Sequence, residues 1–380
     1  MGLFNFDSDF NRRGHNSIKW DINPEDVIPM FIADMDFPSP PSIVEALQER
    51  LKFPAFPYER SMALLLNSGV SWLKRIYGLD VPLDWVIPVA GIVPALHAFI
   101  KLSNKPAITS VPNYTKLHAT PERFDGTMLD SAMIASKGED GLLGYAVDLE
   151  DLEEKSREAE LFYFTNPHNP LGKVYDRSEL EEIARIADKN GLVVLSDEIH
   201  CEIVYEKKHI PYFEIAGDNS ISLYSAGKIC NMPGLPHAFA VIPNASLRDK
   251  VRRITGSMGH PGTLDYVGAA AAFSEKTDGW KREVVEYMAG NRDFLQAELK
   301  KRLPKVELAR VEGTYLQWIG FGAYITGDAK DKIRATAKVE LTGSTRFGGD
   351  GSYVRLNFAC PRFRLADAID RIAGALETGL

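Results

Sequence analysis

Continuous apolar runs that alternate with helical segments are the strongest constraint on how this chain can fold. Four such runs occupy residues 161–164, 192–195, 221–224 and 238–242. A strand that is apolar at every position is buried on both faces, which is typical of a mostly parallel sheet covered by helices on both sides. The sequence therefore predicts an α/β fold.

The segment between the first two runs carries the start and stop signals of a helix. Apolar residues recur at helical spacing over residues 179–189. Ser178 is a suitable N-cap with Glu181 completing a capping box, and Gly191 is placed to end the helix before the next strand.

Length and composition narrow the class of protein. The chain has 380 residues, enough for two domains, with 45% hydrophobic and 25% charged residues. Its net charge is -8 and its lysines and arginines form no block, which argues against nucleic-acid binding. No apolar run reaches about 18 residues and the start lacks a signal-peptide pattern, so we expect a soluble, cytoplasmic protein that does not enter a membrane. The cysteines lack the paired spacing of a zinc site.

Polar side chains follow three of the predicted strands. Asn169, Asp197 and Lys228 stand after the runs 161–164, 192–195 and 221–224. Ligands of such sheets gather beyond the carboxyl ends of the strands, so we expect these three residues at one edge. An amine and a carboxylate placed in this way are what a pyridoxal phosphate enzyme requires, because the lysine forms a Schiff base and the carboxylate keeps the ring nitrogen protonated. Taken alone, the S-x-x-K pattern also occurs in serine acylases, and an Asp-Glu pair after a strand is usually solvated.

Further motifs are spread along nearly the whole chain. With them, the chain resembles the class I/II aminotransferase superfamily of pyridoxal phosphate enzymes (fold type I), and is most similar to its cystathionine β-lyase, or carbon-sulfur lyase, branch, which includes the maltose-regulon modulator. The motifs that carry this resemblance are residues 11–14, 19–21, 32–37, 166–172, 197–200 and 312–316, Lys228 with Asn231, and residues 355–362.

The resemblance also implies a phosphate site at residues 91–93. Gly91, Ile92 and Val93 stand at the start of a predicted helix, where free backbone N–H groups favour an anion. Ser225 matches a hydroxyl ligand of the same phosphate. Tyr58 resembles a tyrosine that reaches the phosphate of a neighbouring subunit, although Pro57 stands where a glycine is common.

The resemblance also implies residues around the cofactor ring. Tyr114 matches the aromatic side chain that stacks on the ring, and with Lys228 and Asp197 it completes the expected catalytic set. Asn169 resembles the residue that donates a hydrogen bond to the ring's phenolic oxygen. His200 stands where many aminotransferases have a tyrosine that serves this oxygen, so it is a candidate neighbour, whereas His168 is expected to be structural.

The expected substrate contacts are Arg355, which matches the arginine that binds the α-carboxylate bidentately, and Asp34, from a signature lining the entrance. Arg362 is close in sequence but equally fits a loop or surface role. Many aminotransferases carry an arginine eight residues after the lysine; this chain has Pro236 there, as the lyase branch does. The absence of this arginine favours the lyase branch.

The resemblance divides the chain into a large cofactor-binding domain, residues 46–282, and a small α/β domain from residues 1–45 and 283–380. The later part is predicted to contain a helix over residues 282–302, strands near 314–319 and 353–358, and a final helix from Leu365. The glycine-rich residues 348–351 lack the Lys-Ser/Thr of a nucleotide loop and are interpreted as a turn.

These observations favour a pyridoxal-phosphate-dependent lyase that cleaves cystathionine or another cysteine S-conjugate to a thiol, pyruvate and ammonia. An aminotransferase is the first alternative, because both reactions use the same residues around the cofactor. A pyridoxal phosphate protein that acts through a regulatory partner is the second. We also expect a homodimer with shared active sites. The sulfur substituent of the substrate is left open.

Overall fold

A computed structural model describes residues 2–57, 62–114, 116–117 and 126–377. Its centre is an eight-stranded sheet in which parallel pairs join β3, β4, β6, β7 and β8. Antiparallel pairs add β9 and β2 at one end and β5 at the other. The predicted α/β fold with a mostly parallel sheet is confirmed. In spatial order the strands are β2 (Val86–Val89), β9 (Ala238–Val241), β8 (Ser220–Tyr224), β7 (Val193–Asp197), β6 (Leu161–Thr165), β3 (Ala107–Val111), β4 (Met128–Lys137) and β5 (Leu143–Val147).

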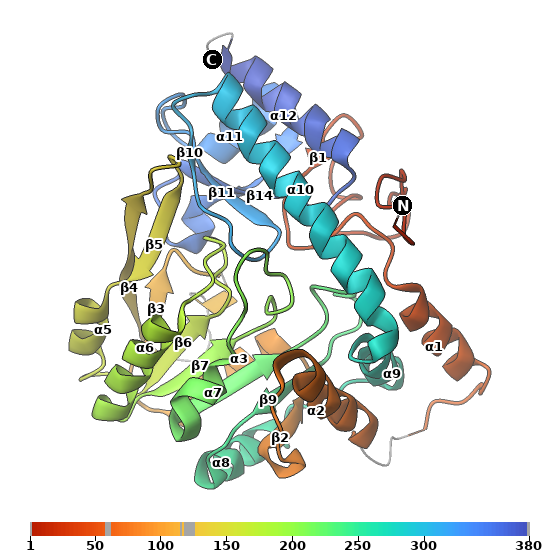
Figure 1. Cartoon of the computed structure of the whole chain (residues 1–380), viewed down its shortest axis with the longest axis vertical. Helices are drawn as coiled ribbons and strands as arrows, with labels where there is room; N and C mark the ends of the chain where they lie inside the picture. Colours follow the sequence, from red (N-terminus) through yellow and green to blue (C-terminus); the bar gives the residue numbers. More distant parts are fainter. Residues whose placement is uncertain (1, 58–61, 115, 118–125, 378–380) are drawn as a thin grey trace.

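Alternate residues of the central strands pack against different helices. Phe162 and Phe164 of β6 belong to the apolar cluster that includes α6 (Arg177–Asn190), whereas Tyr163 belongs to the cluster that includes α3 (Ile92–Phe99) and α8 (Ala245–Thr255). Since side chains alternate across a strand, both faces of the sheet are covered at its centre, which explains why its central strands are largely apolar. Further helices around the sheet are α5 (Leu149–Lys155) and α7 (Tyr212–Ala216) beside α6, and α1 (Pro41–Leu51), α2 (Ala63–Tyr77) and α9 (Thr263–Ala272) (Figure 1).

The start of α6 differs from the prediction. The helix is capped by Asp176, whose backbone N–H donates to the Glu179 carboxylate at 2.9 Å, and not by Ser178 with Glu181. Both pairs have capping-box spacing, and the helix begins at the pair that lies nearer to the preceding strand. Gly191 ends the helix in the left-handed conformation, as predicted.

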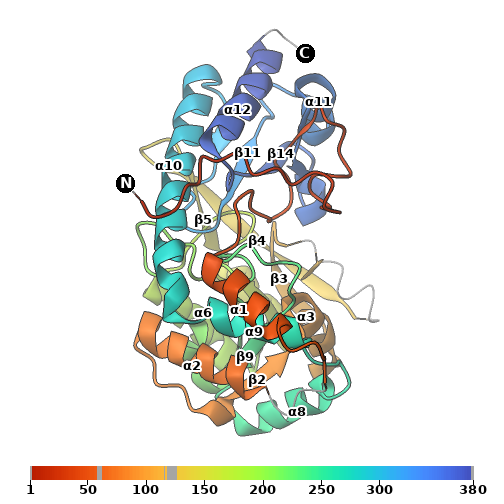
Figure 2. The ribbon, with the colours of Figure 1, turned by 90° about the vertical axis from the view of Figure 1, so that its right-hand side faces the viewer.

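A second, antiparallel sheet of four strands is formed by the C-terminal part. Its order is β10 (Glu307–Leu308), β11 (Leu316–Gly320), β14 (Tyr353–Asn357) and β13 (Thr342–Gly343). The N-terminal segment lies beside this part (Figure 2), and β1 (Ile28–Pro29) pairs with β12 (Val339–Glu340). The helices are α10 (Asp278–Arg302), α11 (Ala329–Ala337) and α12 (Arg362–Glu377).

The helices α10 and α12 each begin a few residues before the predicted start. The glycine-rich residues 348–351 contain no helix or strand, and Gly348 forms a turn before β14, where the sequence predicted one. The division into a large and a small domain at residues 45 and 282 stays a prediction. Within the described ranges, no helix combines the length and the apolar character needed to span a membrane.

Candidate active site

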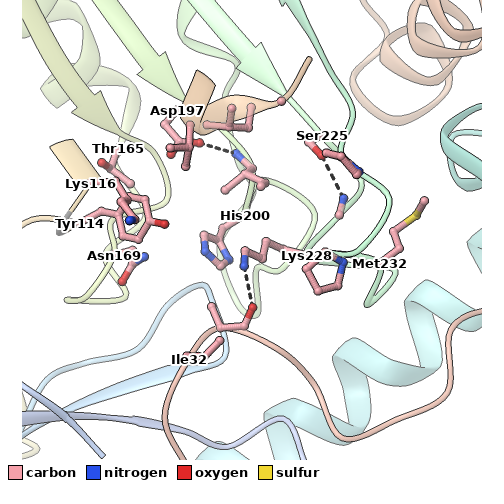
Figure 3. A pocket seen from close by; sticks show the side chains of 18 of the residues that line it. Ile32, Tyr114, Lys116, Thr165, Asn169, Asp197, His200, Ser225, Lys228 and Met232 are labelled. Carbon is pink, nitrogen blue, oxygen red and sulfur yellow. Dashed lines mark hydrogen bonds between the residues drawn. The ribbon is translucent and has the colours of Figure 1, made fainter. Parts of the chain in front are cut away.

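A cavity of about 600 Å³ opens at the carboxyl ends of the parallel strands. It lies between the large sheet, the loop of residues 32–33, and β13 and β14 (Figure 3). The cavity is lined by most of the site residues that were predicted from the sequence: Gly91, Ile92, Val93, Tyr114, Asn169, Asp197, His200, Ser225, Lys228 and Arg355. Asp34 is not among its lining residues, and Tyr58 lies outside the described residues.

Lys228 projects into this cavity from the turn that follows β8. Its Nζ donates a hydrogen bond to the Ala33 carbonyl at 2.6 Å (Figure 3). Burial, with a smaller contribution from Arg355, lowers the pKa of the Lys228 amine to about 8, although Asp34 and Asp197 oppose the shift. A lowered pKa leaves more of the amine uncharged near neutral pH, the form that attacks a carbonyl carbon or accepts a proton.

Asp197 is the last residue of β7 and is only 4% exposed. Its Oδ1 accepts a hydrogen bond from the Ile199 backbone N–H at 3.1 Å. Burial raises the pKa of the Asp197 carboxyl to about 6, although this N–H and Lys228 act in the opposite direction. A buried carboxylate with so little compensation is stabilised by a cationic N–H group in the cavity, as a protonated ring nitrogen would provide.

His200 lies beside Lys228 and is buried (Figure 3). Its Nδ1 has no hydrogen-bond partner among the described residues, and its ring contacts Tyr315 edge-on with centroids 5.7 Å apart. Burial lowers the pKa of His200 well below its usual value, so its ring is neutral. His168 is also buried but does not line the cavity, in keeping with the structural role expected for it.

The phosphate end of the cavity is marked by Gly91, the N-cap of α3. Its φ of +154° lies in a region that glycine adopts readily, and an added Cβ would meet Pro94 Cδ at 3.5 Å and Pro236 Cβ at 3.9 Å. The backbone is thereby open to close approach by an anion, beside free N–H groups of the helix start. Ser225 faces the same cavity, and its Oγ accepts from the Gly227 N–H at 3.1 Å.

His237 supports this turn and was missed by sequence reasoning. Its Nδ1 donates to the Leu235 carbonyl at 2.8 Å, which leaves Nε2 to accept from the Ala226 N–H at 3.1 Å. The Ser225 Oγ lies 3.3 Å from the same Nε2. Burial lowers the pKa of His237 to about 4, so the ring stays a neutral acceptor. The sequence signal that could have identified His237 was its position directly after Pro236, the residue that replaces the arginine found in many aminotransferases.

Tyr114 is positioned by a buried polar network. The Asn113 Oδ1 accepts from the Tyr114 N–H at 2.7 Å and from the Thr165 hydroxyl at 2.9 Å, and the Asn113 amide donates to Thr109 Oγ1 at 2.9 Å. The network ties the residues after β3 to the end of β6. Thr165 lines the cavity as well, which the sequence gave no reason to expect.

Arg355 on β14 is buried and reaches the cavity from the second sheet. Its Nη1 donates to Asn169 Oδ1 at 2.9 Å, and its guanidinium lies 4.8 Å from the Phe347 ring centre. Burial lowers the pKa of Arg355, but a guanidinium remains protonated at neutral pH. Among the described residues it has no carboxylate partner, so the cavity presents a positive charge for an anion.

The expected role of Asp34 at the entrance is not reflected in its contacts. Its carboxylate binds Arg12 bidentately at 2.8 and 3.0 Å, while Asp36 forms a buried ion pair with Lys19 at 3.1 Å. These pairs hold the loop, and Ile32 and Ala33 line the cavity instead. Arg362 donates to Asn291 Oδ1 and does not line the cavity.

The lining residues fit pyridoxal phosphate. The phosphate of this cofactor requires open N–H groups, and its ring nitrogen requires a carboxylate. Its ring face packs against an aromatic side chain, and its aldehyde reacts with an amine. The cavity offers Gly91 with the start of α3, Asp197, Tyr114 and Lys228 in that order. The burial of Asp197, which raises the pKa of its carboxyl, is the observation that supports this fit most directly.

Comparison with known proteins places the chain in a family. The model of the family described as aminotransferase class I and II matches residues 139–372. Cystathionine beta-lyase PatB of Bacillus subtilis is 31% identical over 98% of this chain and 100% of its own. Protein MalY of Escherichia coli is 27% identical over 99% of both chains. The crystal structure of the PLP-bound C-S lyase from Staphylococcus hominis has a TM-score of 0.91 at 28% identity and covers 98% of both chains. The chain therefore belongs to the aminotransferase class I and II family, in the branch of the cystathionine β-lyases.

Proposed function

We propose that this protein is a pyridoxal-phosphate-dependent carbon-sulfur β-lyase. It would convert a cysteine S-conjugate, such as cystathionine, and water into a thiol, pyruvate and ammonia. The observation that carries the proposal is the joint placement of the Lys228 amine, the Asp197 carboxylate and the Arg355 guanidinium on one cavity of a chain in the cystathionine β-lyase branch. The aminotransferase alternative is the weaker one.

Five side chains or backbone groups would hold the cofactor. Lys228 would bind its aldehyde carbon, Asp197 would keep a proton on its ring nitrogen, and Tyr114 would pack on the ring face. The N–H groups at Ile92 and the hydroxyl of Ser225 would bind the phosphate. When bound, the cofactor supplies an electron sink that acidifies the α-carbon of an amino acid.

The remaining steps belong to the residues of the chain. Arg355 would bind the α-carboxylate and so orient the α-hydrogen. The Lys228 amine, with its lowered pKa, would remove the α-proton. The bond between the β-carbon and sulfur would then break, the electron pair would leave with the thiolate, and a proton would complete the thiol. Water addition at the α-carbon and loss of ammonia would yield pyruvate.

The stoichiometry of products tests the proposed reaction. The purified holoenzyme, incubated with cystathionine or an S-alkyl cysteine and no keto acid, should release thiol and pyruvate in equal amounts over many turnovers. Elimination regenerates the cofactor, so no acceptor is needed. Thiol can be followed with a disulfide reagent and pyruvate with lactate dehydrogenase in the same sample.

Transamination would give a different result, because each turnover would leave the amine form of the cofactor and stop without an added keto acid. A strict requirement for a keto acid would therefore assign the protein to the aminotransferases. Negligible turnover under both conditions, together with co-purification of a transcriptional regulator, would favour the regulatory alternative.

We also propose that the working unit is a homodimer. Large apolar side chains are exposed on α1, the loop after it and α2, and include Val44, Leu51, Phe53, Phe56 and Leu64. Such a patch on one segment is typical of an interface. Tyr58 lies between Phe56 and Leu64 in the sequence, which supports a contribution of Tyr58 to the partner's phosphate site. The proposed location is the cytoplasm, which cell fractionation can test.

Sedimentation should show a dimer at assay concentrations. Wild-type subunits mixed with the Tyr58→Phe/Lys228→Ala double variant should form heterodimers whose intact Lys228 site lacks the partner's hydroxyl. These heterodimers should need more added cofactor for half-maximal activity than wild-type dimers need. An active monomer, or equal cofactor demand, would refute the shared site.

A further inference from the structure

A second arginine lines the cavity and has no role in the proposed chemistry. Arg346 belongs to the short helical turn Ser344–Phe347 between β13 and β14. It is exposed, and among the described residues it forms no hydrogen bond or ion pair through its guanidinium. Its charge acts on both Tyr114 and Arg355, so it is close to the two residues assigned to the cofactor ring and the α-carboxylate.

A buried hydroxyl group points to a ligand at the same place. Thr342 lines the cavity and is only 6% exposed, yet its Oγ1 has no hydrogen-bond partner among the described residues. Thr342 stands directly opposite Arg355 in the antiparallel pair of β13 and β14. Buried hydroxyl groups are rarely left without a partner, so this donor is available to a bound molecule.

The charges of the lining residues indicate the sign of that molecule. Lys116, Arg346 and Arg355 are cationic side chains of the cavity, Lys228 would be bound to the cofactor's aldehyde carbon, and Asp197 is the carboxylate of the cavity. His200 and His237 are neutral because burial lowers the pKa of each. The α-carboxylate would occupy Arg355, and the cofactor's phosphate is assigned to the start of α3 and Ser225, so neither provides a counter-charge for Arg346. Two guanidinium groups of like charge at one wall are stabilised best by two anionic groups.

We propose that Arg346 and Thr342 form a subsite for a second anionic group of the substrate. The preferred substrates would then be cysteine S-conjugates whose sulfur substituent ends in a carboxylate or a similar oxyanion. This inference rests on the proposed lyase function for the identity of the substrate, but the anion subsite itself does not depend on turnover. The apolar wall at Ile32 and Ala33 suits the methylene groups that such a substituent contains.

Equilibrium binding to the holoenzyme tests the subsite without turnover. The probe is 3,3'-thiodipropionate, which carries two carboxylates and lacks the amino group needed for reaction, and 3-(propylthio)propionate is the analogue with one carboxylate. By titration calorimetry, the dicarboxylate should bind about 10- to 100-fold more tightly, as expected for a hydrogen-bonded charge pair. Arg346→Met should remove most of this ratio, and Thr342→Val should reduce it by about three- to tenfold.

Matched controls separate the subsite from general electrostatics. Arg157→Met removes an exposed arginine far along the chain that does not line the cavity, and it should leave the ratio as in wild type. Arg346→Lys should retain part of the ratio, because the charge remains while the bidentate geometry is lost. A ratio that persists in Arg346→Met, or that falls equally in Arg157→Met, would overturn the subsite.

Turnover then tests the substrate class. The ratio of kcat/KM for S-(2-carboxyethyl)cysteine to that for S-propylcysteine should exceed one in the wild type and fall about 10-fold or more in Arg346→Met. An unchanged ratio in this variant would refute the inference while thiol and pyruvate release still supports the lyase. Release of neither product, with the dicarboxylate preference in binding intact, would refute the lyase and leave the anion subsite standing.

Discussion

Lys228→Ala should lower kcat/KM for carbon-sulfur cleavage by about 10⁴-fold. The change removes one amine with two proposed tasks, because Lys228 would bind the cofactor's aldehyde carbon and move the α-proton. Two neighbouring cavity residues offer no substitute, since burial lowers the pKa of His200 and makes it a weak base, and Arg355 does not give up its proton. Single-turnover and steady-state rates of thiol release would measure the loss.

Borohydride reduction provides the accompanying chemical test. In the wild type, reduction followed by peptide mapping should place the pyridoxyl group on Lys228, and the variant should carry no such label. Label on Lys116, the other lysine among the described cavity residues, would contradict the assignment. Burial lowers the pKa of Lys228, so its charged form destabilises the native state at pH 7, and the apo variant should unfold at no markedly lower temperature than apo wild type.

Asp197→Asn should reduce turnover by about 10²- to 10³-fold, which corresponds to about 3–4 kcal/mol of transition-state stabilisation. An amide has nearly the same shape as the carboxylate but cannot hold a proton on the ring nitrogen. Near-normal turnover would refute the role. The proposed loss is in kcat, whereas the affinity for the α-carboxylate at Arg355 should change little.

The adjacent residue offers a matched control. Glu198 is also buried, but it faces the core, where it accepts hydrogen bonds from His209 at 2.6 Å and Tyr224 at 2.9 Å. Glu198→Gln should lower the thermal midpoint, because it disturbs a buried charge network. The folded fraction should keep kcat within about threefold of wild type. A similar loss of kcat in both variants would mean that Asp197→Asn acts through general distortion.

Much of the fold could be predicted because its signals are local in the sequence. The apolar runs identify the parallel strands, since each strand must be buried on both faces. The stop at Gly191 was correct because its left-handed conformation is a property of the residue itself. The N-cap was wrong because Ser178 and Asp176 offer equivalent local chemistry, and only packing against the sheet selects between them.

The same distinction applies to the cavity. Asn169, Asp197 and Lys228 could be placed at one edge from sequence alone, because each follows a strand and parallel strands end at the same edge. The entrance role of Asp34 stays a prediction, since the structure shows its carboxylate bound to Arg12 and does not place it in the cavity lining. Thr342 and Arg346 belong to no motif considered in the sequence, so nothing local identified them as cavity residues.

By itself, the sequence determined which strands form the core and which residues stand at their ends, because the burial of a strand and the turn that follows it depend on residues that are neighbours in the chain. Only the tertiary structure decided which distant groups meet across the cavity. The Ala33 carbonyl accepts from Lys228, 195 residues away, and Thr342 faces Arg355 only because β13 pairs with β14 in one register. Such contacts depend on the packing of whole elements, which no short stretch of sequence specifies.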